Sequence, residues 1–398
     1  MSSAPARVAT GSIPLTSRSN ATRFTIVACA LFAVLGIVTT LLGPILPFLT
    51  ARWSISSAEA GTLFSWQFVA STIGTLLSGA ALSKRGFRFP VLLGIGLCLV
   101  GVVALMRSNW TLGRYAVACY GFGLGVSLPA INLAVAEANP GKRAGSVSVL
   151  NFSWGIGAVV GPVLLRTMHS LSLFLLLTGV MLVAALVAAS VSAMPPRTVN
   201  LTKEMSRLRD AKPFWYVAPL LALSMFLFCG VENAIAGWAS SLALPSFSNA
   251  YAATSANIAF WTFFLLARAL APVALRFVSE AKLLIISIVL GAGGAIVFFL
   301  FAHPAVILFA CGLAGLGIGP AFPLLIARVS EAIGPGRPAA TICFAFAGFG
   351  AATLPTLMGI VGARFQEPRV ELMVPFLALL LVLPASRWVA PSRFAARS

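Results

Sequence analysis

Charged side chains are scarce in this sequence. Only 9% of its 398 residues are Asp, Glu, Lys or Arg, whereas about 25% is usual in a soluble domain. Apolar residues make up 59%, and a soluble protein of that composition would expose large hydrophobic patches and aggregate. The shortage of charge therefore excludes a soluble enzyme with a large core and indicates a protein that lies within a membrane.

Residues for metal, redox or catalytic chemistry are also missing or scattered. The six cysteines lie inside apolar runs without a CxxC pair, so we infer neither a disulfide framework nor a metal site. The two histidines, His169 and His303, are too few for a metal cluster. No nucleophile–base pair is recognisable, and no GxxxxGK[ST] loop is present for an ATP-driven pump. We expect no cofactor and no enzymatic activity.

Long apolar runs fill most of the chain. A helix that crosses a bilayer needs about 20 mostly apolar residues. The first run, Phe24 to Leu49, is too long for the core of a signal peptide, so we expect it to be retained as a span. The sequence predicts an all-α membrane protein with 12 transmembrane helices, at residues 24–50, 58–82, 89–106, 112–136, 145–167, 170–193, 213–242, 254–277, 281–302, 305–329, 338–362 and 371–389.

The net charge of +18 comes from basic residues in the short gaps between these runs. That placement indicates the lipid bilayer, not nucleic acid, as the partner. Of the 27 Lys and Arg residues, Arg268 lies in a span, 20 lie on the side of the N-terminus, and six lie opposite: Arg52, Arg107, Arg114, Arg166, Arg364 and Arg369. The excess predicts a multi-pass protein of the cell (inner) membrane with both termini in the cytoplasm.

The chain repeats itself. Gly315, Gly317 and Gly319 lie 194 positions after Gly121, Gly123 and Gly125. The same offset relates Pro129 to Pro323, Glu137 to Glu331, Arg143 to Arg337 and Gly36 to Gly230. Such a repeat predicts two pseudo-symmetric six-helix bundles. We expect a cytoplasmic tail at 1–23, bundles at 24–193 and 213–389, a cytoplasmic linker at 194–212 and a second tail at 390–398.

The segment Gly79-Ala-Ala-Leu-Ser-Lys-Arg-Gly-Phe-Arg88 resembles the loop signature GxLaDrxGrk of the major facilitator superfamily. Its usual Asp is Ser83 here, which weakens the charge clamp of that loop. The resemblance implies the major facilitator fold, with Lys84, Arg85 and Arg88 in a gating role.

Four further segments resemble the fucose–galactose–glucose:H⁺ symporter family. They are Gly121-Phe-Gly-Leu-Gly-Val-Ser-Leu-Pro129, Asn151-Phe-Ser-Trp-Gly-Ile-Gly157 with Gly161-Pro162, Gly230-Val-Glu-Asn233 with Trp238, and Phe260-Trp261 with Ala267-Arg268. The resemblance implies uptake of a hexose or related sugar, often with a proton. The first span lacks the acidic residue that some members carry there.

Glu232 is the one acidic residue placed well inside a predicted span. Because a charge at this depth costs at least about 2.5 kcal/mol, it must face a cavity or a partner. Its expected role is proton coupling or sugar binding, and the alternative is a hydrogen-bond anchor between helices. Arg268 shares a helical face with Asn257, Trp261 and Phe264, and is expected either to gate the path or to contact the ligand.

Amides and indoles supply the remaining candidates for the binding site. Amides hydrogen-bond sugar hydroxyls, and aromatic rings stack on the apolar face of a sugar. In membrane helices the same residues also join neighbouring helices or lie at the interface. The expected substrate-binding residues are Gln67, Asn132, Asn151, Trp154, Glu232, Asn233, Trp238, Asn257 and Trp261.

Three functions are compatible with these patterns. The first is a monomeric proton-coupled sugar importer, with Na⁺ as a possible alternative to H⁺. The second is an exporter of drugs or small metabolites, since Gly157-x-x-x-Gly161-Pro162 resembles part of an antiporter signature. The third is a membrane sensor that has lost transport.

Overall fold

Helices account for every regular element in the computed structural model, which describes residues 15–195, 217–333, 338–365 and 369–388. The N-terminal half contains α1 (Leu15–Thr39), α2 (Leu42–Trp53), α3 (Ser57–Arg85), α4 (Arg88–Leu105), α5 (Trp110–Ala138), α6 (Arg143–Met168) and α7 (Leu171–Val191). The C-terminal half contains α9 (Val217–Ala243), η1 (Leu244–Ser246), α10 (Ala250–Ala253), α11 (Ser255–Ala274), α12 (Glu280–Leu300), α13 (Pro304–Ile318), α14 (Ala321–Ala332), α15 (Pro338–Phe365), η2 (Val370–Leu372) and α16 (Met373–Trp388).

Ten helical stretches within the described ranges are long and apolar enough to cross a membrane. The other two predicted spans correspond to α3, which is long at 29 residues but rich in Ser and Thr, and to α16, whose apolar stretch is short. The twelve predicted spans are therefore confirmed as helical segments, in order. The expected linker and C-terminal tail lie outside the described residues, except for Met194 and Pro195. α1 starts at Leu15, inside the expected N-terminal tail.

Two of the predicted spans are broken in the middle. The first divides into α1 and α2 around Thr40 and Leu41, and the tenth into α13 and α14 at Gly319 and Pro320. Proline explains both breaks, because its ring clashes with the carbonyl four residues earlier and it has no N–H to donate. Pro44 acts in this way on the carbonyl of Thr40.

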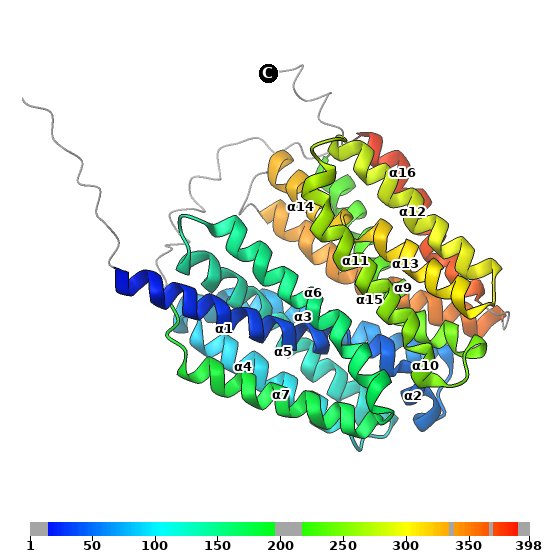
Figure 1. The fold of residues 1–398 in the computed structure, drawn as a ribbon, viewed down its shortest axis with the longest axis horizontal. Helices are drawn as coiled ribbons and strands as arrows, with labels where there is room; N and C mark the ends of the chain where they lie inside the picture. Colours follow the sequence, from blue (N-terminus) through cyan, green and yellow to red (C-terminus); the bar gives the residue numbers. More distant parts are fainter. Residues whose placement is uncertain (1–14, 196–216, 334–337, 366–368, 389–398) are drawn as a thin grey trace, which may run out of the picture.

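The repeat in the sequence is also a repeat of helix boundaries. α5 begins at Trp110 and α13 at Pro304, 194 positions later. α5 ends at Ala138 and α14 at Ala332, again 194 positions later. Figure 1 shows the two halves as separate groups of helices, blue to green and yellow-green to red. Within them α5 packs on α3 and α4. Its counterpart α13 packs on α11 and α12, which are the counterparts of α3 and α4.

The two halves meet mainly through α3 with α15, α2 with α9 and α6 with α11. α2 and α10 lie at one end of the molecule (Figure 1), where α2 packs on α9 and α10 packs on α6 of the other half. Ser65 and Thr356 share a hydrogen bond of 2.7 Å between their hydroxyls, and Thr356 also bonds the carbonyl of Gly61 at 2.9 Å. Phe48 and Tyr251 pack with ring centroids 4.6 Å apart. One end of the interface between the halves is thus closed by direct contacts.

Candidate functional site

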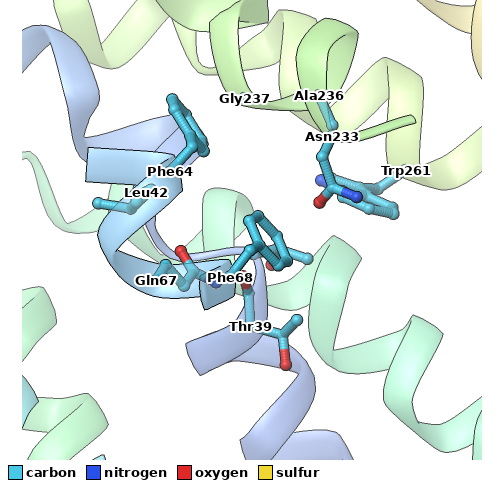
Figure 2. Close-up of a pocket in the computed structure, with 11 residues that line it drawn as sticks. Thr39, Leu42, Phe64, Gln67, Phe68, Asn233, Ala236, Gly237 and Trp261 are labelled. Atoms are coloured by element: carbon cyan, nitrogen blue, oxygen red, sulfur yellow. Dashed lines mark hydrogen bonds between the residues drawn. The ribbon is translucent and has the colours of Figure 1, made fainter. Parts of the chain in front are cut away.

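A small pocket lies between the halves, where α1, α2 and α3 face α9 and α11 (Figure 2). Its empty volume, which includes open solvent, is about 250 Å³. Its walls are mostly apolar with a few polar groups, which is typical of a ligand site. The lining residues are Thr39, Thr40, Leu42, Gly43, Phe64, Gln67, Phe68, Asn233, Ala236, Gly237 and Trp261.

The pocket walls follow the internal repeat. Asn233 lies 194 positions after Thr39, and Gly237 lies 194 positions after Gly43. Trp261 stands in the same relation to Gln67. Equivalent positions of the two halves therefore face each other across the pocket, as expected for a cavity on the axis that relates the halves.

Gln67 is anchored at both ends of its amide. Its Nε2 donates to the carbonyl oxygen of Thr39 at 2.8 Å, and its Oε1 accepts from the Tyr120 hydroxyl at 3.0 Å. The Thr39 carbonyl is available because it lies at the break between α1 and α2. Gln67 thus ties α1, α3 and α5 together at the pocket wall, and only 1% of its surface is exposed.

Two tryptophans from opposite halves meet beside the pocket. The rings of Trp154 on α6 and Trp261 on α11 pack edge to face with centroids 5.7 Å apart. Trp154 Nε1 donates to Thr39 Oγ1 at 3.2 Å, whereas Trp261 Nε1 is buried and has no hydrogen-bond partner among the residues that the structure describes. Only Trp261 of this pair lines the pocket.

Glu232 and Arg268 form an ion pair across α9 and α11. Their side chains approach to 3.8 Å, with Glu232 13% and Arg268 20% exposed. Arg268 also lies 4.3 Å above the Phe264 ring centre and 5.9 Å from that of Trp154. Neither charged residue lines the pocket. The pair gives each charge a partner, which a protein interior within a membrane requires.

A freed backbone carbonyl holds Arg268 in place. Its Nε donates to the carbonyl oxygen of Gly319 at 3.1 Å, at the break between α13 and α14. In a regular helix the N–H four residues later would occupy that oxygen, but residue 323 is a proline and has none. The break therefore provides a hydrogen-bond acceptor directed at α11, and it fixes the position of the guanidinium group.

Four other predicted binding residues do not line the pocket. Trp238 Nε1 donates to the Pro355 carbonyl at 2.9 Å and joins α9 to α15. Asn257 is fully buried and bonds the Ser240 hydroxyl and the Ala236 carbonyl, which joins α11 to α9. Asn151 donates to Asn132 Oδ1 at 3.1 Å and joins α6 to α5. In this structure these side chains connect helices, which was the alternative role considered for them.

The basic residues at the end of α3 and the start of α4 lie at the end of α3 that is remote from α2. Arg85 is exposed, and its guanidinium carbon lies 4.5 Å from the ring centre of Phe89. Arg88 donates to the Ser192 carbonyl at 3.0 Å, near the end of α7. The side chain of Lys84 is outside the part of the structure described.

Sequence reasoning missed most of the apolar pocket wall, including Phe64, Phe68 and the two facing glycines, Gly43 and Gly237. It also missed Thr39, which bonds both Gln67 and Trp154. A signal for these positions was present, because Thr39 and Gly43 map onto Asn233 and Gly237 at the offset of the repeat.

The fold and site define a membrane transport protein with two equivalent halves. The chain belongs to the Major Facilitator Superfamily, whose family model matches residues 28–355. It is therefore a multi-pass membrane protein of secondary transport, not an enzyme, and the resemblance seen in its sequence is confirmed at the level of the superfamily.

Solved transporters share the fold. The E. coli fucose:proton symporter FucP, in a variant form, covers 92% of this chain with 98% of its own length, at 15% identity and a TM-score of 0.61. The nucleoside transporter NupG, also a variant, covers 95% of this chain with all of its own length, at 14% identity and a TM-score of 0.70. At such low identity these likenesses show the twelve-helix fold alone. The search among curated proteins gave no match.

Proposed function

We propose that this protein takes up a hexose or a related sugar together with a proton, by alternating access of its two halves. The observation that carries the proposal is an uncharged, mostly apolar pocket with a few polar groups between the halves, lined by the residue that follows a carboxyl group of α9 in the sequence. Asn233 lines the pocket and Glu232 precedes it in α9. The resemblance to the sugar symporter family supports the choice of substrate.

The roles follow from the geometry. Asn233 and Trp261 hold the sugar, Gln67 shapes the pocket wall beside it, and Trp154 supports Trp261 from the opposite half. Glu232 carries the proton, and Arg268 responds to its charge through the ion pair. Proton uptake by Glu232 removes the negative partner of Arg268, which leaves the guanidinium held by Gly319 and the aromatic rings alone.

The two bundles, 24–193 and 213–389, are the moving units in this proposal, and both termini lie in the cytoplasm. With that orientation the closed end near α2 and α10 faces outward. The basic cluster of Lys84, Arg85 and Arg88 then lies at the cytoplasmic end, where it gates the inner opening.

Purified protein in liposomes tests the proposal. With acid outside, the wild-type protein is expected to accumulate labelled L-fucose, D-galactose or D-glucose against its gradient. Glu232→Gln is expected to abolish accumulation but keep exchange of sugar for sugar, because the neutral amide mimics the protonated carboxyl. Glu280→Gln is the matched control, since Glu280 pairs with Arg328 at 3.5 Å on α12, away from the pocket.

Two results would contradict this function. Sugar uptake that ignores the pH gradient in the wild-type protein removes the proton coupling. Protection of cells from toxic cations, without sugar flux, favours the exporter instead. Gly157 and Gly161 of the antiporter-like segment contact α1 at Ala33 and Ile37, so helix packing explains that segment without export.

A further inference from the structure

The indole of Trp261 is an unused hydrogen-bond donor at the pocket. Trp261 is only 4% exposed, and its Nε1 has no acceptor within the described structure. Other shielded indoles do have acceptors: Trp53 bonds the Ser108 carbonyl, and Trp238 bonds that of Pro355. Leaving a buried N–H unpaired costs about 1–3 kcal/mol. At a cavity wall, a ligand group can supply the missing acceptor.

An unused acceptor lies on the neighbouring helix, α9. Asn233 Nδ2 donates to the Cys229 carbonyl at 2.8 Å, which fixes the direction of the amide. Its Oδ1 has no partner among the residues described. Figure 2 shows Asn233 and Trp261 on the same side of the pocket. A hydroxyl group accepts one hydrogen bond and donates another, so it can satisfy both residues together.

The rest of the wall is apolar or already bonded. Phe64 and Phe68 supply aromatic surface on the α3 side. Gln67 has both amide atoms engaged, and Thr39 Oγ1 donates to the Leu35 carbonyl at 2.7 Å while it accepts from Trp154. Specific recognition therefore concentrates on Trp261 and Asn233.

Charge is kept out of the pocket. None of its lining residues is ionisable, and Glu232 and Arg268 neutralise each other nearby. A charged ligand would lose its hydration without gaining a partner, which costs several kcal/mol. This arrangement favours an uncharged ligand.

We propose that the pocket selects an uncharged hydroxyl compound, one hydroxyl of which accepts from Trp261 Nε1 and donates to Asn233 Oδ1. Its C–H surface lies against Phe64 and Phe68, and Glu232 does not touch it. This inference rests on the proposed function in that the ligand is a sugar. It does not depend on proton coupling, because it concerns binding and not transport.

Isothermal titration of the full-length protein in detergent tests this assignment with D-glucose, D-galactose, L-fucose and uridine. Trp261→Phe keeps an aromatic ring but removes the N–H, so affinity for the bound neutral probe is expected to fall roughly 5- to 10-fold. Trp66→Phe is the matched control, because Trp66 lies on α3 beside Gln67 with its side chain 36% exposed, and its affinity should be unchanged.

Charge and hydroxyl position are tested with derivatives of the sugar that binds. The uronate and amino-sugar forms of that sugar should bind at least about 10-fold more weakly than the neutral sugar itself. One monodeoxy sugar should bind wild type and Trp261→Phe equally, because it lacks the hydroxyl that the indole contacts.

The outcomes separate this inference from the proposed function. Equal affinities of wild type and Trp261→Phe overturn it, as does tighter binding of a charged derivative or the absence of binding by all four neutral probes. If only uridine binds, and binds more weakly to Trp261→Phe, the donor and acceptor pair is supported but a sugar substrate is contradicted. If the sugar binds as expected but is not accumulated in response to a pH gradient, only the proposed proton coupling is contradicted.

Discussion

The two halves of this protein share helix boundaries at a constant offset but distribute their polar chemistry unequally. Glu232 and Arg268 lie in the C-terminal half, and their counterparts 194 positions earlier are Val38 and Gly74. The N-terminal half instead contributes the amide of Gln67, where the C-terminal half has Trp261. The halves thus share helix boundaries, but both ion pairs among the described residues, Glu232–Arg268 and Glu280–Arg328, lie in the C-terminal half.

The same contrast holds for the backbone. Pro129 and Pro323 are equivalent, and each removes the N–H that would bond the carbonyl of Gly125 or Gly319. In the C-terminal half Arg268 uses that oxygen, and Pro320 breaks the helix beside it. In the N-terminal half the counterpart of Arg268 is Gly74, and α5 continues unbroken. A shared proline thus supports an ion site in one half and only close packing in the other.

The largest effect is expected from removing the arginine. Arg268→Ala leaves Glu232 without its partner, and we expect a loss of about 3 kcal/mol in stability. Addition of Glu232→Gln should recover most of that loss, because no unpaired charge remains. Thermal denaturation of the purified protein measures both, with the exposed Arg276→Ala as control. If the double variant is no more stable than Arg268→Ala, the unpaired charge of Glu232 is not the cause of the lost stability.

A glycine substitution tests the half that relies on packing. A methyl group at Gly125 would collide with the Ser71 carbonyl oxygen, so Gly125→Ala should lose about 1–3 kcal/mol. Gly96→Ala is the matched control, since nothing lies within 4 Å of its added methyl group. The measurement is again the melting temperature, and equal values for the two variants would mean that α3 and α5 do not approach this closely.

The smallest effect concerns a hydrogen bond that only one half has. Ser78 Oγ donates to the Val126 carbonyl at 2.9 Å, and the equivalent residues of the C-terminal half are Pro272 and Pro320. Ser78→Ala should cost about 0.6 kcal/mol, the usual value for such bonds between membrane helices. Ser153→Ala, whose hydroxyl bonds a carbonyl of its own helix, should cost less. The opposite order would mean that this bond does not stabilise the N-terminal half.

Most of the fold was predictable because bilayer thickness sets helix length, and a constant sequence offset reports a repeat. The chemistry of α3 was partly predictable: Gln67, Ser71 and Ser78 share a face, but that face packs on α5. The pairing of Glu232 with Arg268 could not be derived, because it depends on the rotation of α9 against α11. The hydrogen bonds of Trp238 and Asn257 could not be predicted from the sequence, because they too depend on how neighbouring helices are rotated.

The break at Thr40 and Leu41 separates two helices that pack on different halves of the protein. α1 packs on α5, α6 and α7 of its own half, whereas α2 packs on α9 of the other half. Gly43 on α2 fits against the Ala236 carbonyl, and Phe48 contacts Tyr251. Any rocking of one half against the other must therefore flex the chain between Thr39 and Gly43. Thr39, Thr40, Leu42 and Gly43 line the pocket, so a molecule bound there would contact the part of the chain that bends when the halves move.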